Sequence, residues 1–144
     1  MGHRIERSES IHFSCQQMFE LVNDIEAYPE YMEGCQKAEI LNSGEGWLEA
    51  RLSLGMGGIS QSFVTRNTLH PPHSMTLDLL DGPFREFKGE WRFANEGDQC
   101  KVTLELVFSM KNPLLAFAAN RMFEQIAESQ VKALCHRASQ IYAN

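Results

Sequence analysis

The chain has 144 residues, 43% of them hydrophobic and 22% charged, which excludes disordered and fibrous classes and fits one domain with one core. Its 13 Lys and Arg residues against 19 Asp and Glu residues give a net charge of −6, which argues against a protein that coats nucleic acid by bulk electrostatics. No apolar run reaches the ~20 residues that span a bilayer, and the N-terminus lacks a signal-peptide core, so we expect a cytoplasmic chain without a membrane span.

The four cysteines, Cys15, Cys35, Cys100 and Cys135, stand singly in the sequence. They form no C-x-x-C pair, and no cluster of cysteine and histidine has the spacing of a zinc site. We therefore expect buried or half-buried free thiols in a reducing compartment, with no metal bound.

The first helix signal follows an N-terminal strand and begins at Ser14. The Ser14 hydroxyl can cap free N–H groups, and Gln17 can reach back to complete a capping box. Tyr28-Pro29 interrupts this helix, because the residue before a proline resists the αR conformation. A second short helix is predicted over residues 28–33, with the proline in its first turn.

From residue 36 to 110 most of the chain alternates apolar and polar residues, most clearly over residues 100–110. This alternation is typical of antiparallel strands that bury one face and expose the other to solvent. Turn-forming residues separate the strands at 42–44, 55–58, 70–73, 81–83 and 95–98. The segment 59–69 is less regular, because Phe63 shares a face with the polar residues Thr65 and Asn67.

A long C-terminal helix is predicted from Asn112, as N-cap, and Pro113, in the first helical position. Neither glycine nor proline occurs over residues 114–144, and a helix of about 30 residues is about 45 Å long. Its apolar stripe must lie along the inner face of the sheet, which predicts an α+β fold. Residues 111–144 carry 4 Lys and Arg against 2 Asp and Glu, so this helix is mildly basic on an acidic body.

A strongly curved sheet around one helix encloses more volume than its backbone fills. The pattern alone leaves two alternatives open, a solid core or an apolar pocket, since both need large apolar side chains on the inner face. The glycine-rich residues 55–58 and the turn at 81–83 favour a pocket, because an entrance could open there. Trp91 lies mid-strand on this face, and its indole N–H needs either a ligand or a backbone carbonyl as partner.

Three blocks of the sequence resemble one family. Residues 21–29 read L-V-N-D-I-E-A-Y-P and resemble the L-V-N-D-[VI]-x-x-Y-P signature of the coenzyme Q-binding protein / ribosome association toxin RatA family. Residues 58–67 are similar to its second block, and residues 81–93 to its third. The resemblance covers essentially the whole chain, including the C-terminal helix.

The resemblance implies the START-like helix-grip fold of the polyketide cyclase/dehydrase superfamily. In that fold a curved antiparallel sheet of about seven strands surrounds a long C-terminal helix, with two short helices after the first strand. We expect a single lipid-binding domain over residues 1–144, mostly monomeric. The side chains expected to line its cavity are Tyr28, Pro29, Leu52, Leu54, Phe63, Leu77, Leu79, Phe84, Trp91, Phe93, Leu104, Leu106, Phe108, Met122, Phe123 and Ile126.

The resemblance also implies a function but leaves two roles open. Some family members are implicated in binding an isoprenoid quinone, ubiquinone, and in supporting respiration, whereas the RatA name denotes action on ribosomal subunit association. A mitochondrial targeting extension is absent, so we expect a bacterial member. A ribosomal contact would use the basic residues of the C-terminal helix, although a solvated polar face is the simpler explanation of these residues. These residues are Lys111, Arg121, Lys132 and Arg137, with Arg66, Arg85, Lys88 and Arg92 on the sheet.

The third hypothesis is an aromatase/cyclase-like enzyme. General acid–base chemistry needs ionisable groups that face the pocket, and only His70 and His73 flank a turn near a plausible opening. No G-x-S-x-G, H-E-x-x-H or phosphate-binding loop pattern occurs. We therefore expect a binding protein without catalytic residues, cofactor, metal or DNA partner.

Overall fold

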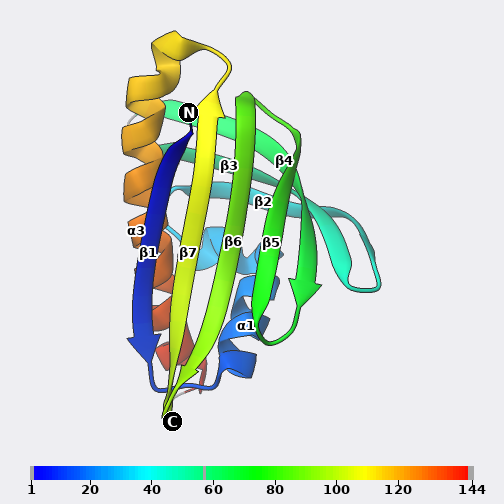
Figure 1. Cartoon of the computed structure of the whole chain (residues 1–144), viewed down its shortest axis with the longest axis vertical. Coiled ribbons are helices and arrows are strands. Elements are labelled where there is room, and N and C mark those ends of the chain that lie inside the picture. The colour runs from blue at the N-terminus through cyan, green and yellow to red at the C-terminus, as the bar shows by residue number, and fades with distance from the viewer. Residues whose placement is uncertain (1, 57, 143–144) are drawn as a thin grey trace.

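The first strand of the chain pairs with its last, and all seven strands form one antiparallel sheet curved around a long helix (Figure 1). The computed structural model describes residues 2–56 and 58–142, apart from the side chain of residue 59. In chain order the elements are β1 (His3–Ile11), α1 (Cys15–Asn23), the 3₁₀ turn η1 (Ile25–Ala27), α2 (Tyr28–Tyr31), β2 (Cys35–Gly44), β3 (Trp47–Met56), β4 (Ile59–His70), β5 (Ser74–Asp81), β6 (Phe84–Glu96), β7 (Gln99–Met110) and α3 (Pro113–Tyr142).

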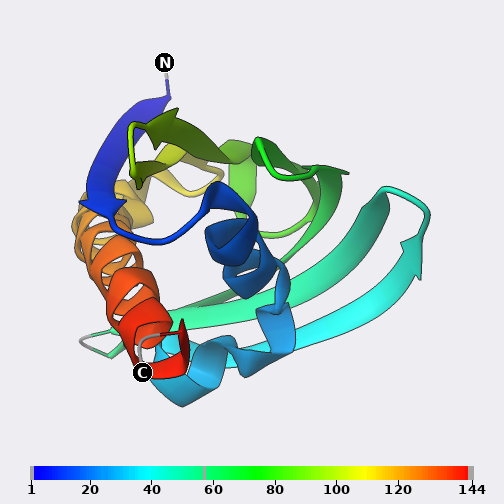
Figure 2. The same cartoon turned by 90° about the horizontal axis from the view of Figure 1, so that it is seen from below.

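The strand order across the sheet is β1-β7-β6-β5-β4-β3-β2, so β1 and β2 are the two edges. Seen from below, the sheet curls from β1 round to β2, and the short helices lie across its open end beside α3 (Figure 2). This arrangement confirms the predicted α+β helix-grip fold, with about seven strands and two short helices after the first strand.

The start of α1 has the predicted capping box. The Gln17 backbone N–H donates to Ser14 Oγ over 3.0 Å, and the Ser14 N–H donates to Gln17 Oε1 over 2.9 Å. The second helix ends at Tyr31, two residues earlier than predicted, because Met32 turns to an extended conformation and buries its side chain. Gly34, with φ of +88°, then reverses the chain into β2.

The turn predicted at residues 42–44 is wrong, since these residues continue β2 and Gly44 pairs with Trp47. The hairpin loop is Glu45-Gly46, and Gly46 supplies the positive φ of +77° that a two-residue loop requires. The irregular segment around Phe63 is strand β4, between β3 and β5.

Helix α3 begins as predicted, with the Leu114 N–H donating to Asn112 Oδ1 over 3.0 Å. It packs on β1 and β7 of the sheet and on α1. The predicted cysteine state is confirmed, because all four cysteines are buried and free. Among the described residues, no helix is long and apolar enough to cross a membrane.

Candidate functional site

A cavity of about 50 Å³ lies between the inner face of the sheet and α3. Five strands, β3 to β7, line it together with η1, α2 and α3. The lining residues are Ile25, Tyr28, Ala50, Leu52, Leu54, Phe63, Thr65, Asn67, Leu77, Phe87, Trp91, Leu104, Leu106, Phe123, Ile126 and Gln130. This volume exceeds that of one water molecule but is far below the ~300 Å³ or more of a typical small-molecule site. A larger ligand therefore has to displace lining side chains.

The structure brings ten of the sixteen residues expected to line the cavity to its wall: Tyr28, Leu52, Leu54, Phe63, Leu77, Trp91, Leu104, Leu106, Phe123 and Ile126. It places the other six elsewhere. Pro29 is exposed on α2, and Leu79 is half-buried near the end of β5. Phe93 packs against Phe19 of α1, with ring centroids 5.8 Å apart.

The remaining three expected residues, Phe84, Phe108 and Met122, are buried in the core behind the cavity wall. Phe84 and Phe108 both contact the ring of Phe123, at centroid distances of 5.6 and 4.9 Å. Alternation identifies the inner face of a strand, but in a curved sheet only mid-strand positions reach the gap, while the ends pack on helices. This accounts for the four strand residues, Leu79, Phe84, Phe93 and Phe108, whereas Pro29 lies on α2 and Met122 on α3.

Six wall residues were absent from the expected set: Ile25, Ala50, Thr65, Asn67, Phe87 and Gln130. Ala50 and Phe87 follow the alternation of their strands, so the alternation could have identified both as inward-facing residues. Gln130 stands four residues after Ile126, on the same face of α3. Thr65 and Asn67 share the face of Phe63, but their polarity argued against an inward position.

The polar pair on β4 is the distinctive feature of the wall. Thr65 and Asn67 are only 1% and 2% exposed, and Thr65 Oγ1 donates to Asn67 Oδ1 over 2.7 Å. The Asn67 amide N–H donates to the Met75 sulfur over 3.6 Å, a weak acceptor. Buried polar groups usually have strong partners, so this amide can donate to a ligand oxygen that enters the cavity.

A second residue of the same wall carries an N–H donor. Trp91 on β6 is buried and lines the cavity, and no hydrogen bond joins its indole N–H to a described residue. Of the two partners expected for this group, a backbone carbonyl is therefore not found among the residues that the structure describes. The cavity can offer a bound molecule two N–H donors in an otherwise apolar wall.

Tyr28, the tyrosine of the Y-P signature, is the one ionisable side chain among the residues lining the cavity. Its hydroxyl donates to the backbone carbonyl of Val22, which ties α2 to α1. Burial raises the pKa of Tyr28 well above its ordinary value, with a smaller contribution from Tyr31. The phenol therefore stays protonated and holds the backbone in place.

The two histidines considered for catalysis do not reach the cavity. His70 and His73 are exposed at the two ends of the Pro71-Pro72 turn between β4 and β5. Within the described part of the chain, no group of three or more histidine, cysteine, aspartate or glutamate side chains could hold a metal ion.

The basic residues expected to contact a ribosome do not form one free surface. Arg137 is paired with Glu30 at 3.3 Å. On the outer face of the sheet, Arg92 bonds the carboxylates of Glu6, Glu90 and Glu105, at 2.7, 2.9 and 2.7 Å.

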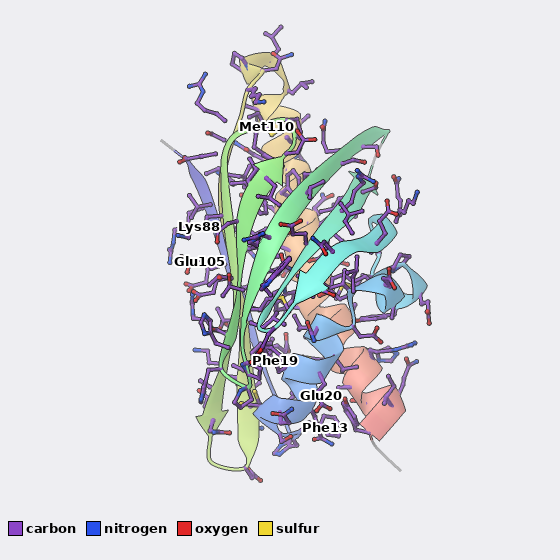
Figure 3. The ribbon with its side chains drawn as sticks, turned by 90° about the vertical axis from the view of Figure 1, so that its right-hand side faces the viewer. Phe13, Phe19, Glu20, Lys88, Glu105 and Met110 are labelled. Carbon is purple, nitrogen blue, oxygen red and sulfur yellow. The ribbon has the colours of Figure 1, made fainter. Side chains whose placement is uncertain are left out.

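Arg66 is also engaged, since it pairs with Glu49 at 2.7 Å and lies over the Trp47 ring. Lys88 stands on the sheet face that carries Glu105, away from α3 (Figure 3). Arg121 and Lys132 are exposed on one side of α3, about three turns apart. Lys132 lies 3.9 Å from Glu128, an exposed pair on the helix surface, and Arg121 has no carboxylate partner among the described residues.

Comparison with known proteins places these features in a family. The family described as polyketide cyclase / dehydrase and lipid transport matches residues 11–135. The ribosome association toxin RatA of Pseudomonas aeruginosa is 38% identical over 99% of both chains. The mitochondrial coenzyme Q-binding protein COQ10 homolog B of Xenopus laevis is 27% identical over 96% of this chain and 60% of its own length.

A solved structure shares the fold. The Zhui aromatase/cyclase from Streptomyces sp. R1128 superposes with a TM-score of 0.84 at 19% sequence identity, over 99% of this chain and 98% of its own. The two named relatives confirm the resemblance found in the three motif blocks. The match over residues 11–135 and the full-length similarity to RatA show that this chain belongs to the polyketide cyclase / dehydrase and lipid transport family.

Proposed function

We propose that the chain binds an isoprenoid quinone such as ubiquinone, or a similar lipid with a carbonyl in its head group, and thereby supports respiration from the cytoplasm. The observation that carries this proposal is the polar pair on β4, which places buried donors inside an apolar wall. A quinone ring and its isoprenoid tail suit the apolar side chains. The amide of Asn67 and the indole of Trp91 suit the ring oxygens.

Binding requires the cavity to grow from about 50 Å³. The rings of Phe63, Phe87 and Phe123 are the side chains that can make room. Phe63 is tilted against Phe87 and set edge-on to Phe123, at centroid distances of 5.1 and 6.4 Å. Rotation of these rings would convert the small cavity into a slot without breaking a backbone hydrogen bond.

Titration with a short-chain ubiquinone tests this function. In a Trp47→Phe background, we expect saturable quenching of Trp91 fluorescence. Asn67→Leu should weaken binding by about five- to tenfold, because it removes a hydrogen bond to the ligand worth about 1 kcal/mol. The control is Asn95→Leu, a change of the same kind at an exposed position on β6. The absence of saturable quenching in the parent protein would contradict the proposal.

We further propose that the chain binds its ligand without transforming it. The support is the chemistry of the wall, in which the sole ionisable side chain is Tyr28, held protonated and bonded to the backbone. General acid–base catalysis needs a group that changes protonation near neutral pH. The same titration provides the check, since mass spectrometry of the extracted quinone should recover it unchanged.

A second candidate function is binding of the large ribosomal subunit. It is supported by the 38% identity to a protein named ribosome association toxin RatA, together with the shared face of Arg121 and Lys132. We expect the protein to pellet with large subunits at moderate salt, and the double variant Arg121→Glu, Lys132→Glu to stay in the supernatant while it still quenches with quinone. Lys37→Glu, on the remote edge strand β2, is the control. If the double variant pellets like the parent protein, α3 is not the contact.

A further inference from the structure

The first turns of α3 expose large apolar side chains. Leu114, Phe117 and Leu115 are 89%, 74% and 41% exposed, whereas the rest of the helix buries most of its apolar residues. This part of α3 rises beyond the ends of the strands in Figure 1. Full burial of a leucine or phenylalanine side chain contributes about 1.5–3 kcal/mol, so a surface of this kind marks a binding partner. We call Lys111, Leu114, Leu115, Phe117 and Arg121 the α3 tip.

The charge of the α3 tip differs from that of the rest of the molecule. Residues 111–123 contain Lys111 and Arg121 and no acidic residue, although the chain as a whole carries a net charge of −6. The Arg121 guanidinium lies 6.0 Å from the centre of the Phe117 ring. Neither cation is paired with a carboxylate of a described residue. Apolar side chains beside unpaired cations are the combination that binds an anionic bilayer surface.

The α3 tip is connected to the cavity through one layer of aromatic rings. The Lys111 N–H donates to the carbonyl of Pro83 over 3.0 Å, which fixes the turn between β5 and β6 against the tip. The next residue, Phe84, contacts Phe63 and Phe123 of the cavity wall at centroid distances of 5.3 and 5.6 Å. Phe84 therefore lies between the turn that the tip holds and the cavity wall.

We propose that the α3 tip docks on an anionic phospholipid bilayer, with Leu114 and Phe117 inserted among the lipids and Lys111 and Arg121 at the head groups. A protein partner fits less well, because a stable interface buries at least about 1,000 Å² and the tip is a narrow projection of three apolar side chains. Transfer of the lipid from bilayer to cavity rests on the proposed function, whereas docking itself rests on the exposed residues of the tip.

Sedimentation with vesicles tests the docking. The protein should bind vesicles that mix phosphatidylcholine with phosphatidylglycerol, bind poorly to phosphatidylcholine alone, and dissociate as salt is raised. Leu114→Asp and Phe117→Asp should each weaken binding by about tenfold or more, as expected for the loss of one inserted apolar side chain. Ile141→Asp changes a 47% exposed residue at the other end of the same helix, and this control should bind like the parent protein.

Several outcomes would overturn the docking: no binding to the mixed vesicles, or equal binding by the parent protein and Leu114→Asp. If light scattering shows a dimer that Leu114→Asp dissociates, the partner of the tip is a second copy of the chain and not a bilayer. If Leu114→Asp abolishes pelleting with ribosomes, the partner of the tip is the ribosome. Quinone titration without vesicles separates the two proposals. Quinone binding without vesicle binding refutes docking alone, and vesicle binding without quinone binding refutes the proposed function alone.

Discussion

Phe123 is the residue at which the cavity and the solid part of the core meet. Its buried ring lines the cavity on one side and contacts Phe84 and Phe108 on the other. A side chain in this position has two roles, because it closes the core and also sets the volume available to a ligand. Its removal should therefore change stability and cavity size together.

Phe123→Ala should lower the free energy of unfolding by about 3–5 kcal/mol, the usual range for loss of a buried phenylalanine. Urea unfolding at neutral pH provides the measurement. Phe117→Ala is the matched control on the same helix, and it should change stability by no more than about 0.5 kcal/mol because Phe117 is exposed. Similar losses in both variants would mean that Phe123 does not pack as described.

Among the elements, α1 is the one whose start is set most clearly by its own sequence. Its capping box holds the first turn, and its buried residues Phe19 and Val22 pack in the same core as α3 and the sheet. The helix lies across the open lower end of the sheet (Figure 2), and Figure 3 shows Phe13 and Glu20 at that end, far from Met110 beside the start of α3. Fraying of α1 would therefore open the end of the molecule opposite the α3 tip.

Ser14→Ala removes the acceptor for the Gln17 N–H and should lower the free energy of unfolding by about 1 kcal/mol. Ser14→Asp retains an acceptor and adds favourable charge at the helix N-terminus, so it should keep most of the stability. Thermal unfolding followed by circular dichroism distinguishes the two variants. Equal melting temperatures for both would show that the cap contributes little.

Most elements could be predicted because periodicity and capping are local properties of the sequence. Strand β7 buries every second residue from Cys100 to Met110, and Asn112-Pro113 marks the start of α3. Strand β4 was harder, because inward Thr65 and Asn67 break the expected polarity of a buried face. Cavity volume was out of reach of any pattern, since the same apolar residues can pack solidly or leave a gap, and the difference depends on side-chain rotamers.

At the scale of the whole molecule, three buried thiols connect stability to pH. Cys35 lies on β2, Cys100 on β7 and Cys135 on α3. Burial raises the pKa of Cys35 and Cys135 to about 11 and that of Cys100 to about 12, against an ordinary value of 9.0. The thiolate therefore forms more readily in the unfolded chain than in the folded one.

A raised pKa in the folded state gives stability that is fully present below the unfolded pKa and is lost as pH rises through the folded values. We therefore expect the urea midpoint to be flat up to about pH 8 and to fall between about pH 9 and pH 11. Tyr28 acts with the same sign above its own ordinary pKa of 10.0. The triple variant Cys35→Ala, Cys100→Ala, Cys135→Ala should show a shallower fall. A urea midpoint that rises between about pH 9 and pH 11 would contradict the raised thiol pKa values in the folded state.

The pairing of β1 with β7 has a consequence for synthesis of the chain. His3 is opposite Phe108 in the sheet, so β1 has no pairing partner until the ribosome has synthesised β7, about 100 residues later. At ~5–20 residues per second, that interval lasts about 5–20 s. During this time β1 is an unpaired strand, and its charged residues Arg4, Glu6, Arg7 and Glu9 make it a poor template for other nascent chains. Two of these charges, Arg4 and Glu6, form ion pairs on the finished sheet. We therefore expect them to serve twice, first by disfavouring aggregation of the unpaired strand and later by pairing on the folded sheet.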